Sequence, residues 1–510
     1  MILEMGQGRL RRRFGDSVAC HSPPAGVEEK PRGGSVYGIG PLNRRLLPIF
    51  LITTTLAGCD LAPHYQRPAL ASPSSFPQGP AYPAASGTQD VAAIGWKAFF
   101  TDDKLRQVIA LGLANNRDLR IAAANILQAR AQYRAQRADL FPTVDANASA
   151  DVSHTRATGT THDYSAGLGI SAFELDLFGR VRNLTKAAQE QYFATQAGAD
   201  STRISLIAEI ASAWLTMGSD QDQLALSKQT LATYQQSVDL TRAQFDKGIA
   251  SELDLQQAET NLQDARYDVA QLTTQIAQDQ NALNLLAGTT VTADLLPTGI
   301  GTGDFTLAEL PAGIDSTVLL KRPDVLQAED QLKAENANIG AARAAFFPTI
   351  SLTAAAGTAS TALSGLFTGG AWTWSAGGSA TQTVFDFGKN LANLRYAQAT
   401  KQAAIATYEK AVQTAFREVS DALATRGTIG EQLAARSGKV DAASKAATLS
   451  LARYRSGIDS FLTSLDAQRT LYAAQQNLVT SRLQRETNLV TLYSTLGGGL
   501  TDGATTPPAA

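Results

Sequence analysis

Residues 141–152 read Phe-Pro-Thr-Val-Asp-Ala-Asn-Ala-Ser-Ala-Asp-Val, and residues 347–356 read Phe-Pro-Thr-Ile-Ser-Leu-Thr-Ala-Ala-Ala. Each stretch follows an Ala-rich run that has a helical composition. After each Phe-Pro-Thr, apolar or small residues alternate with others at a period of two, which is typical of a β-strand. Because the same change from helix to strand occurs twice, the pattern indicates an internal repeat.

Other short matches recur at a constant spacing along the chain. The Phe-Gly-Arg sequence at Phe178 to Arg180 returns as Phe-Gly-Lys at Phe387 to Lys389, and Gly288 returns as Gly497. A constant spacing over more than a hundred residues is typical of a tandem duplication. We therefore predict a first repeat over residues 103–300 and a second over residues 301–500.

Each repeat contains one long helical pattern and two shorter ones. The pattern over residues 184–247 lacks Pro, and at 1.5 Å per residue it extends roughly 90 Å. Two short helices placed end to end would match that length, so each repeat could supply matched staves of a tube. The other predicted helices are 103–139, 252–287, 324–345, 390–455 and 460–496. The fold class is therefore mainly α with a small membrane β part.

Four alternating stretches predict the β part, at residues 143–152, 164–172, 349–356 and 372–380. Aromatic residues near their ends, including Trp372 and Trp374, suit a membrane interface. A soluble hairpin packed on helices would show the same alternation. Four strands cannot close a barrel that has a lumen. Either several chains share one barrel, or the membrane interpretation is wrong.

The N-terminal region has the pattern of a lipoprotein signal. The basic pair Arg44 and Arg45 precedes an apolar stretch from Leu46 to Gly58, which ends before Cys59. This order predicts a leader and signal peptide over residues 1–58 that is removed, and a lipidated Cys59. A hydrophobic core segment is the alternative. We further predict an N-terminal arm over residues 59–102 and a disordered tail over residues 501–510.

Charge and chemistry argue against nucleic-acid binding and catalysis. The chain has 44 Lys and Arg, 46 Asp and Glu, and a formal net charge of −2. No basic patch of the kind that binds nucleic acid stands out. His154 and His162 fall in a Gly/Thr-rich stretch that we expect to be a loop, where solvated side chains are favoured over a metal site. No catalytic motif appears in a supporting context, so we expect no enzyme activity.

Several motifs stand in an order that resembles the TolC/OprM outer-membrane factor family over residues 56–500. They are Gly-Cys-Asp-Leu-Ala-Pro from Gly58 to Pro63, Asn-Asn-Arg-Asp-Leu from Asn115 to Leu119, Lys-Arg-Pro-Asp-Val from Lys321 to Val325, and Leu-Asp-Ala-Gln-Arg from Leu465 to Arg469. The resemblance implies a homotrimer. Each protomer would give four strands to a shared twelve-stranded outer-membrane β-barrel, and its helices to a trimeric α-barrel tunnel in the periplasm. A structural coiled-coil protein or adhesin would not be expected to combine these features.

The resemblance also implies a function without chemistry. The protein would be the outer-membrane exit duct of a tripartite efflux pump that expels drugs or other small molecules. Its partners would be a periplasmic adaptor, an inner-membrane transporter of the resistance–nodulation–division type, and outer-membrane lipid. The only bound groups would be the diacylglycerol and N-acyl chain on Cys59. Asp60 departs from the pattern, because Asp after the lipidated Cys retains lipoproteins in the inner membrane of some bacteria. The alternative function is the duct of a type I protein secretion system.

Two kinds of functional site follow from the resemblance. The turns between long helices would be adaptor-docking tips, formed by Gly248, Ile249, Ala250, Ser251, Gly457, Ile458, Asp459 and Ser460. Asp466 and Arg469 share a helix face and would form the periplasmic gate; an intrahelical ion pair is the alternative. In the first repeat Asp254 and Glu259 lie near the equivalent place, but Gln257 replaces the aspartate.

Overall fold

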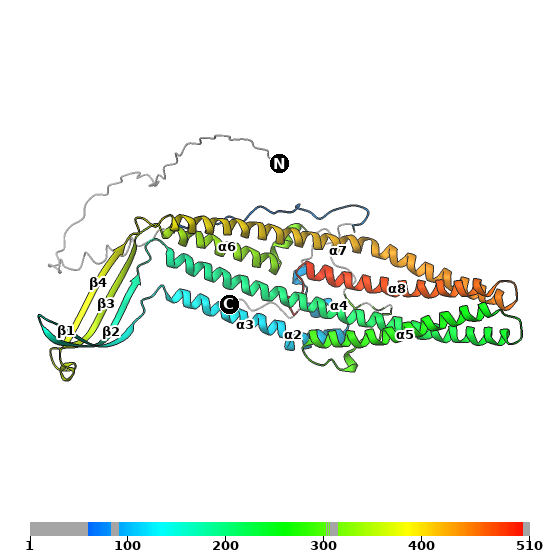
Figure 1. The fold of residues 1–510 in the computed structure, drawn as a ribbon. Coiled ribbons are helices and arrows are strands. Elements are labelled where there is room, and N and C mark those ends of the chain that lie inside the picture. Colours follow the sequence, from blue (N-terminus) through cyan, green and yellow to red (C-terminus); the bar gives the residue numbers. More distant parts are fainter. Residues whose placement is uncertain (1–59, 83–90, 302, 304, 307–314, 503–510) are drawn as a thin grey trace, which may run out of the picture. The chain divides into compact units, whose positions relative to one another are not determined.

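The computed structural model describes most of the chain after the predicted signal. The described residues are 60–82, 91–301, 303, 305–306 and 315–502. The predicted leader, Cys59 and most of the predicted tail lie outside these residues. The described residues all belong to one compact unit, which is mainly helical and carries one four-stranded sheet (Figure 1).

Two long helices dominate the unit, one in each repeat. They are α4 (Arg180–Phe245, 66 residues) and α7 (Lys389–Arg455, 67 residues). The shorter helices are α2 (Asp103–Asn115), α3 (Arg117–Ala138), α5 (Glu252–Ala287), α6 (Pro323–Ala344) and α8 (Phe461–Thr495). Short elements are η1 (Val91–Ala93), α1 (Trp96–Phe99), η2 (Ala293–Leu295), η3 (Ser316–Lys321) and η4 (Leu363–Gly365). The duplicated arrangement of long and short helices is confirmed.

The prediction of a single helix over residues 103–139 is wrong, because the chain breaks at Asn116. This residue has an extended backbone (φ −57°, ψ 139°), and its side-chain oxygen accepts hydrogen bonds from the backbone N–H groups of Asp118 and Leu119. Asn therefore acts as the N-cap of α3. Helical composition alone could not reveal the break, since Asn is also tolerated inside helices.

The helices pack in the order that matched staves require. Helix α4 contacts α3 and α5 on one side and α6 and α8 on the other, and α7 packs against α6 and α8. Figure 1 shows each long helix running beside two shorter ones. The protomer therefore consists of two long helices that alternate with two pairs of short helices.

One antiparallel sheet holds all four strands in the order β1-β2-β3-β4. The strands are β1 (Asp145–Thr155), β2 (Gly159–Glu174), β3 (Thr349–Ser360) and β4 (Trp372–Thr381). The predicted strands are confirmed, and the sheet joins the two repeats through the pairing of β2 with β3. Every residue of β1 and β4 is exposed, and both strands have one unpaired edge. An exposed open edge needs a partner or a cover.

The main hydrophobic core lies where the short helices meet. Trp214 of α4 is 2% exposed, and Phe99 and Phe100 are fully buried beside it in the same cluster. The ring of Tyr493 stacks on Phe99 with centroids 3.9 Å apart, and its hydroxyl donates to the carbonyl of Ile94 at 2.6 Å. Burial of these aromatic side chains anchors the N-terminal arm and the end of α8 on the long helices.

Asn116→Ala should destabilise the protein by about 1–2 kcal/mol, because it removes the cap of α3 and a partly buried hydrogen bond to the carbonyl of Leu286. Thermal unfolding of the purified protein in detergent, followed by helical circular dichroism, measures this effect. The matched control is Asn115→Ala, since among the described residues the side chain of Asn115 bonds to the carbonyl of Leu111 in its own helix. Equal melting temperatures for the two variants would contradict the role of Asn116.

Candidate functional site

Both repeats stack two short helices end to end, and one side chain bridges each junction. In the first repeat, the Asn116 amide donates to the carbonyl of Leu286 at the end of α5 at 2.9 Å. In the second repeat, the guanidinium of Arg322, next to the start of α6, donates to the carbonyl of Thr495 at the end of α8 at 2.9 Å. Carbonyls at a helix end lack intrahelical partners. These two residues therefore satisfy buried groups where each stave is interrupted.

Arg322 also joins a third helix to the second junction. Its guanidinium contacts Asp324 at 2.7 Å and Glu418 of α7 at 2.8 Å. Burial lowers the pKa of Arg322, but the hydrogen bonds and charges of the two carboxylates outweigh burial and raise it overall. The side chain therefore stays charged, and it ties α6 and α7 to the end of α8.

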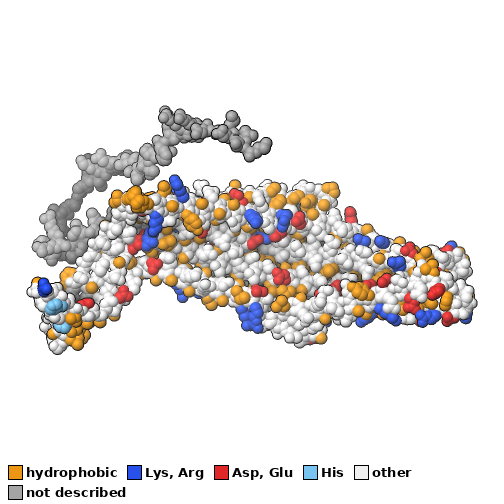
Figure 2. Space-filling model, viewed as in Figure 1, with side chains coloured by type: hydrophobic (Ala, Val, Ile, Leu, Met, Phe, Trp, Pro, Cys, Tyr) orange, Lys and Arg blue, Asp and Glu red, His pale blue; other side chains and the backbone are white. Residues whose placement is uncertain are grey.

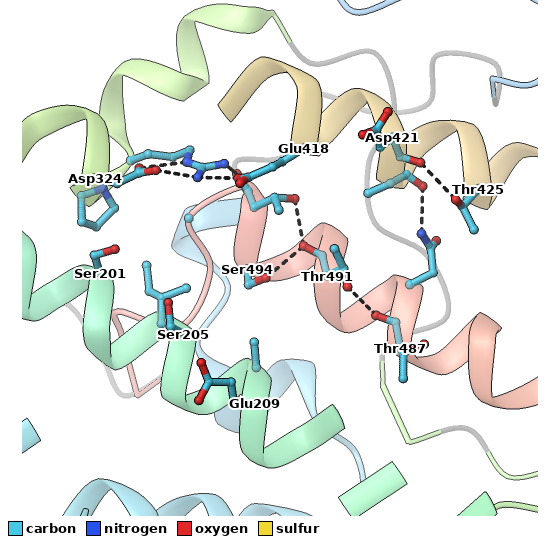
Figure 3. A pocket seen from close by; sticks show the side chains of 18 of the residues that line it. Ser201, Ser205, Glu209, Asp324, Glu418, Asp421, Thr425, Thr487, Thr491 and Ser494 are labelled. Carbon is cyan, nitrogen blue, oxygen red and sulfur yellow. Dashed lines mark hydrogen bonds and ion pairs between the residues drawn. The ribbon is translucent and has the colours of Figure 1, made fainter. Parts of the chain in front are cut away.

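A cavity of about 760 Å³ opens beside this junction (Figure 3). Its lining includes Ser201, Ser205 and Glu209 of α4, Glu418 of α7, and Thr491 of α8. Ile207 and Trp214 of α4, by contrast, are buried in the hydrophobic core. The cavity borders the hydrophobic core, since Ala208 of α4 lines the cavity and also packs against the core.

The two predicted tips are helix reversals with the same backbone chemistry. Gly248 and Gly457 have φ values of 72° and 73°, so the prediction of a left-handed glycine is confirmed at both turns. In each case the next residue, Ile249 or Ile458, donates back across the last helical turn, to Gln244 or Arg453. This is the Schellman arrangement that ends helices at Gly. The following helices begin at two serine caps, Ser251 and Ser460.

Side-chain bonds at the tips differ between the repeats, and sequence reasoning missed them. Arg453 makes two hydrogen bonds to the Asp459 carboxylate at 2.7 and 2.8 Å, which closes the second turn. The Tyr454 hydroxyl donates to Gln244 at 2.5 Å and so links the two tips. The first turn has Ala250 in place of Asp459, so it lacks the ion pair. The two tips are thus linked to each other, but only the second turn is stabilised by an ion pair among the described residues.

The predicted gate residues Asp466 and Arg469 are both exposed on α8. Within the described part of the chain no ion pair joins them, so the alternative of an intrahelical pair is not formed in this protomer. Burial raises the pKa of Tyr234 on α4 to about 12, and the charge of Arg469 opposes that rise. Arg469 therefore lies near α4. Whether these residues gate the tunnel stays a prediction.

The first-repeat residues near the gate position serve local roles. Asp254 completes a capping box with Ser251, and Glu259 forms an ion pair with Arg242. A polar link that the sequence did not indicate lies a turn further along α8. The Tyr472 hydroxyl bonds to Asp268 of α5 and to Ser227 of α4, each at 2.8 Å. Three helices are therefore joined by one tyrosine.

The start of the N-terminal arm is fastened to the helices. The Asp60 carboxylate accepts hydrogen bonds from the nearby backbone N–H of Ala62 and from the side-chain amide of Asn183 in α4, each at 3.0 Å. Arg67 makes a bidentate ion pair with Glu329 of α6, whose side chain is 3% exposed. The residue that follows Cys59 is therefore held at the first turns of α4.

His154 and His162 lie in strands rather than in the predicted loop. His154 is in β1, where its ring contacts Thr160 at 3.0 Å, and His162 is in β2. Across the described residues, no group of three or more His, Cys, Asp or Glu could hold a metal ion. In the face seen in Figure 2, Lys and Arg side chains are interspersed with Asp and Glu, so this face offers no basic stripe.

In the same part of the chain, no helix combines the length and the apolarity needed to cross a membrane.

Long paired helices, stacked short helices and an open four-stranded sheet define the class as the protomer of a tunnel-forming channel. The sequence model of the outer membrane efflux protein family matches residues 108–289 and 316–498. The chain belongs to that family. The two matches fall on the two repeats, which accords with a duplicated protomer.

Relatives and solved structures are similar over nearly the whole chain. A probable efflux pump outer membrane protein, TtgC of Pseudomonas putida, is 47% identical over 90% of this chain and 96% of its own. The outer membrane protein OprJ of Pseudomonas aeruginosa is 41% identical over 89% and 95%. The open state of the MtrE outer membrane channel of Neisseria gonorrhoeae is 36% identical over 88% and 100%, with a TM-score of 0.80.

Proposed function

We propose that this protein is the outer-membrane exit duct of a tripartite efflux pump and passes drugs or other small molecules out of the cell. The observation that carries the proposal is the open protomer. Both edge strands, β1 and β4, are unpaired and exposed, while the helices supply staves that alternate long and paired short. Further copies of the chain can close both the sheet and the row of helices.

A homotrimer closes both parts together. Three copies of a four-stranded sheet make a barrel wide enough for a lumen, and three copies of the helical staves continue that lumen as a tunnel. Closed symmetric assemblies are the usual way in which one chain completes such a ring. The partners would be a periplasmic adaptor and an inner-membrane transporter of the resistance–nodulation–division type. The names of the relatives favour efflux over type I protein secretion.

The tips are the proposed docking site for the adaptor. Ile249 and Leu253 of the first tip are 73% and 65% exposed, and Ile458 and Leu462 hold the same places in the second tip at 63% and 55%. Matched apolar side chains exposed at both turns suit a protein interface. A duct with two similar tips could bind an adaptor in two similar ways.

Ile458→Asp should prevent docking while the fold stays intact, because the side chain is mostly exposed within the protomer. Placing a carboxylate in an apolar contact costs about 2 kcal/mol or more, which is roughly a 30-fold loss of affinity. Accumulation of a fluorescent efflux substrate in cells measures the effect. The matched control is Leu285→Asp, which is 79% exposed and lies at the end of α5 that points away from the tip. Equal accumulation in both variants would argue against docking at the tips.

The gate is proposed at Asp466 and Arg469, whose charges are unpaired within the described protomer and so can bond to a neighbouring copy. Asp466→Ala with Arg469→Ala should raise single-channel conductance in planar bilayers several-fold, because the links that narrow the tunnel are removed. A control pair on α7, Lys439→Ala with Asp441→Ala, also removes one acid and one base. Unchanged conductance of a correctly assembled gate variant would rule this role out.

The anchor is proposed at Cys59, next to the fastened Asp60. Radiolabelled palmitate should enter the wild-type protein and not Cys59→Ser. Some of the variant should still reach the outer membrane, since the barrel anchors the protein by itself. A mass spectrum that shows an unmodified Cys59 inside a longer chain would contradict the anchor. Separation of the inner and outer membranes by density tests whether Asp60 retains any of the protein in the inner membrane.

A further inference from the structure

The two faces of the sheet carry different side chains. Successive residues of a strand point to opposite faces, and residues opposite each other in neighbouring strands share a face. Leu168, Trp372 and Trp374 lie on one face and are 58%, 65% and 73% exposed. Asp151 and Asp163, which lie opposite each other, are on the other face. The sheet therefore has an apolar face and a polar face, and in a membrane barrel the apolar face meets lipid.

Both histidines of the sheet lie on the apolar face. His162 is six residues before Leu168 in β2, so it shares the face of Leu168, and it lies opposite Val152 of β1. His154 is two residues beyond Val152 and lies opposite Thr160. Both side chains are exposed, and Figure 2 shows histidine side chains at the end of the sheet that is remote from the helices. An imidazole prefers water to hydrocarbon, so its place on this face calls for a polar partner.

The histidines come last in a series of side chains that runs along the apolar face. Ala166 and Trp372 are at one level, because both lie opposite Thr358. Tyr164 is two residues further from the helices than Ala166, and His162 is two residues further again, with about 7 Å to each step. Trp and Tyr occur at the level of lipid headgroups in membrane proteins. The histidines therefore lie at that level or just beyond it.

A positive charge stands at the same end of the sheet. Arg156 is exposed in the turn that joins β1 to β2. It is the only Lys or Arg in the sequence between residues 141 and 173, and residues 349–381, which contain β3 and β4, have no charged side chain. The nearest acids in the sequence, Asp151 and Asp163, belong to the polar face. The outer end of the apolar face thus combines a guanidinium with two imidazoles and carries no carboxylate.

The histidine rings are positioned to donate hydrogen bonds outward. Nδ1 of His154 lies 3.0 Å from the Thr160 hydroxyl. When that hydroxyl donates to Nδ1, the ring proton is on Nε2, which is then a hydrogen-bond donor. The ring of His162 stacks on that of Tyr164, with planes 4° apart. Phosphate oxygens are suitable acceptors for such N–H groups and for the Arg156 guanidinium.

We infer that His154, Arg156 and His162 bind the phosphate headgroups of anionic lipid in the outer leaflet of the membrane. The inference rests on the proposed outer-membrane duct, because a sheet that spans the membrane brings this end to the headgroup level. It deepens that proposal by naming the class of lipid at the outer rim of the sheet. Apolar side chains followed by rings and then by donors match the hydrocarbon and headgroup layers of a leaflet, which favours lipid over a protein partner.

Quenching of tryptophan fluorescence by brominated lipids tests the inference in the full-length protein. Trp372 and Trp374 lie on the apolar face, whereas Trp96 and Trp214 are each 2% exposed in the helical core. The protein is inserted into vesicles of equal parts phosphatidic acid and phosphatidylcholine, with bromine on the chains of one lipid and then of the other. The ratio of the two quenching efficiencies gives the relative affinity for phosphatidic acid. We expect a preference of about fivefold, the usual effect of one basic side chain near an anionic surface.

The combined variant His154→Gln, Arg156→Gln and His162→Gln should reduce this preference to about equal affinity. The matched control is Asp151→Asn with Asp163→Asn, which changes the charge of the polar face alone. A local contact leaves the preference of the control at the wild-type value. A preference that persists in the triple variant, or one that rises in the control as net charge alone would require, would overturn the contact.

The same vesicles separate the lipid contact from the proposed duct. Equal quenching of the wild-type protein by the two brominated lipids would show insertion without a preference, and would overturn the contact while the duct stands. If neither lipid quenches the fluorescence, the sheet does not meet lipid, and both proposals fall.

Discussion

Backbone groups at helix ends must find partners, and this requirement governs how the staves are built. In each repeat two short helices meet end to end, so two helix ends are buried at the junction. At one junction the Asn116 amide donates to a helix-end carbonyl. At the other the Arg322 guanidinium does so, and it also forms an ion pair with Glu418 of the neighbouring long helix. Because both junctions are satisfied by side chains, a pair of short helices stays aligned beside one long helix.

Alignment of the staves brings the two helix reversals together. The tips share a small hydrophobic cluster that includes Tyr234, Leu255 and Phe461, and Tyr454 bonds across it to Gln244. The arm is fastened at the strand end of α4 by Asp60 on Asn183, and near the start of α6, close to the Arg322 junction, by Arg67 on Glu329. The connections to the sheet and the tips therefore lie at opposite ends of the same helices, and the junctions lie between them.

Duplication followed by divergence explains why a single chain does not form a closed tunnel. Within the chain, the first repeat rests on the second through Phe178 and Phe347. In the equivalent segment of the second repeat, between β4 and α7, Val384 and Phe387 are almost fully exposed. Two similar halves that pack side by side in one direction leave an open surface at each end of the pair. Further copies cover both open surfaces when they form a closed ring.

The sequence by itself determined the features that depend on near neighbours. Strand alternation, the helix boundary from Glu252 to Ala287, the left-handed glycines at both tips and the duplication all follow from residues close along the chain or from recurring spacing. Tertiary structure alone decided the break at Asn116, the histidines within strands, and the partners of Arg322, Arg67 and Tyr454. Each of those partnerships joins helices or segments far apart in sequence, and local periodicity carries no information about which distant side chain will lie opposite.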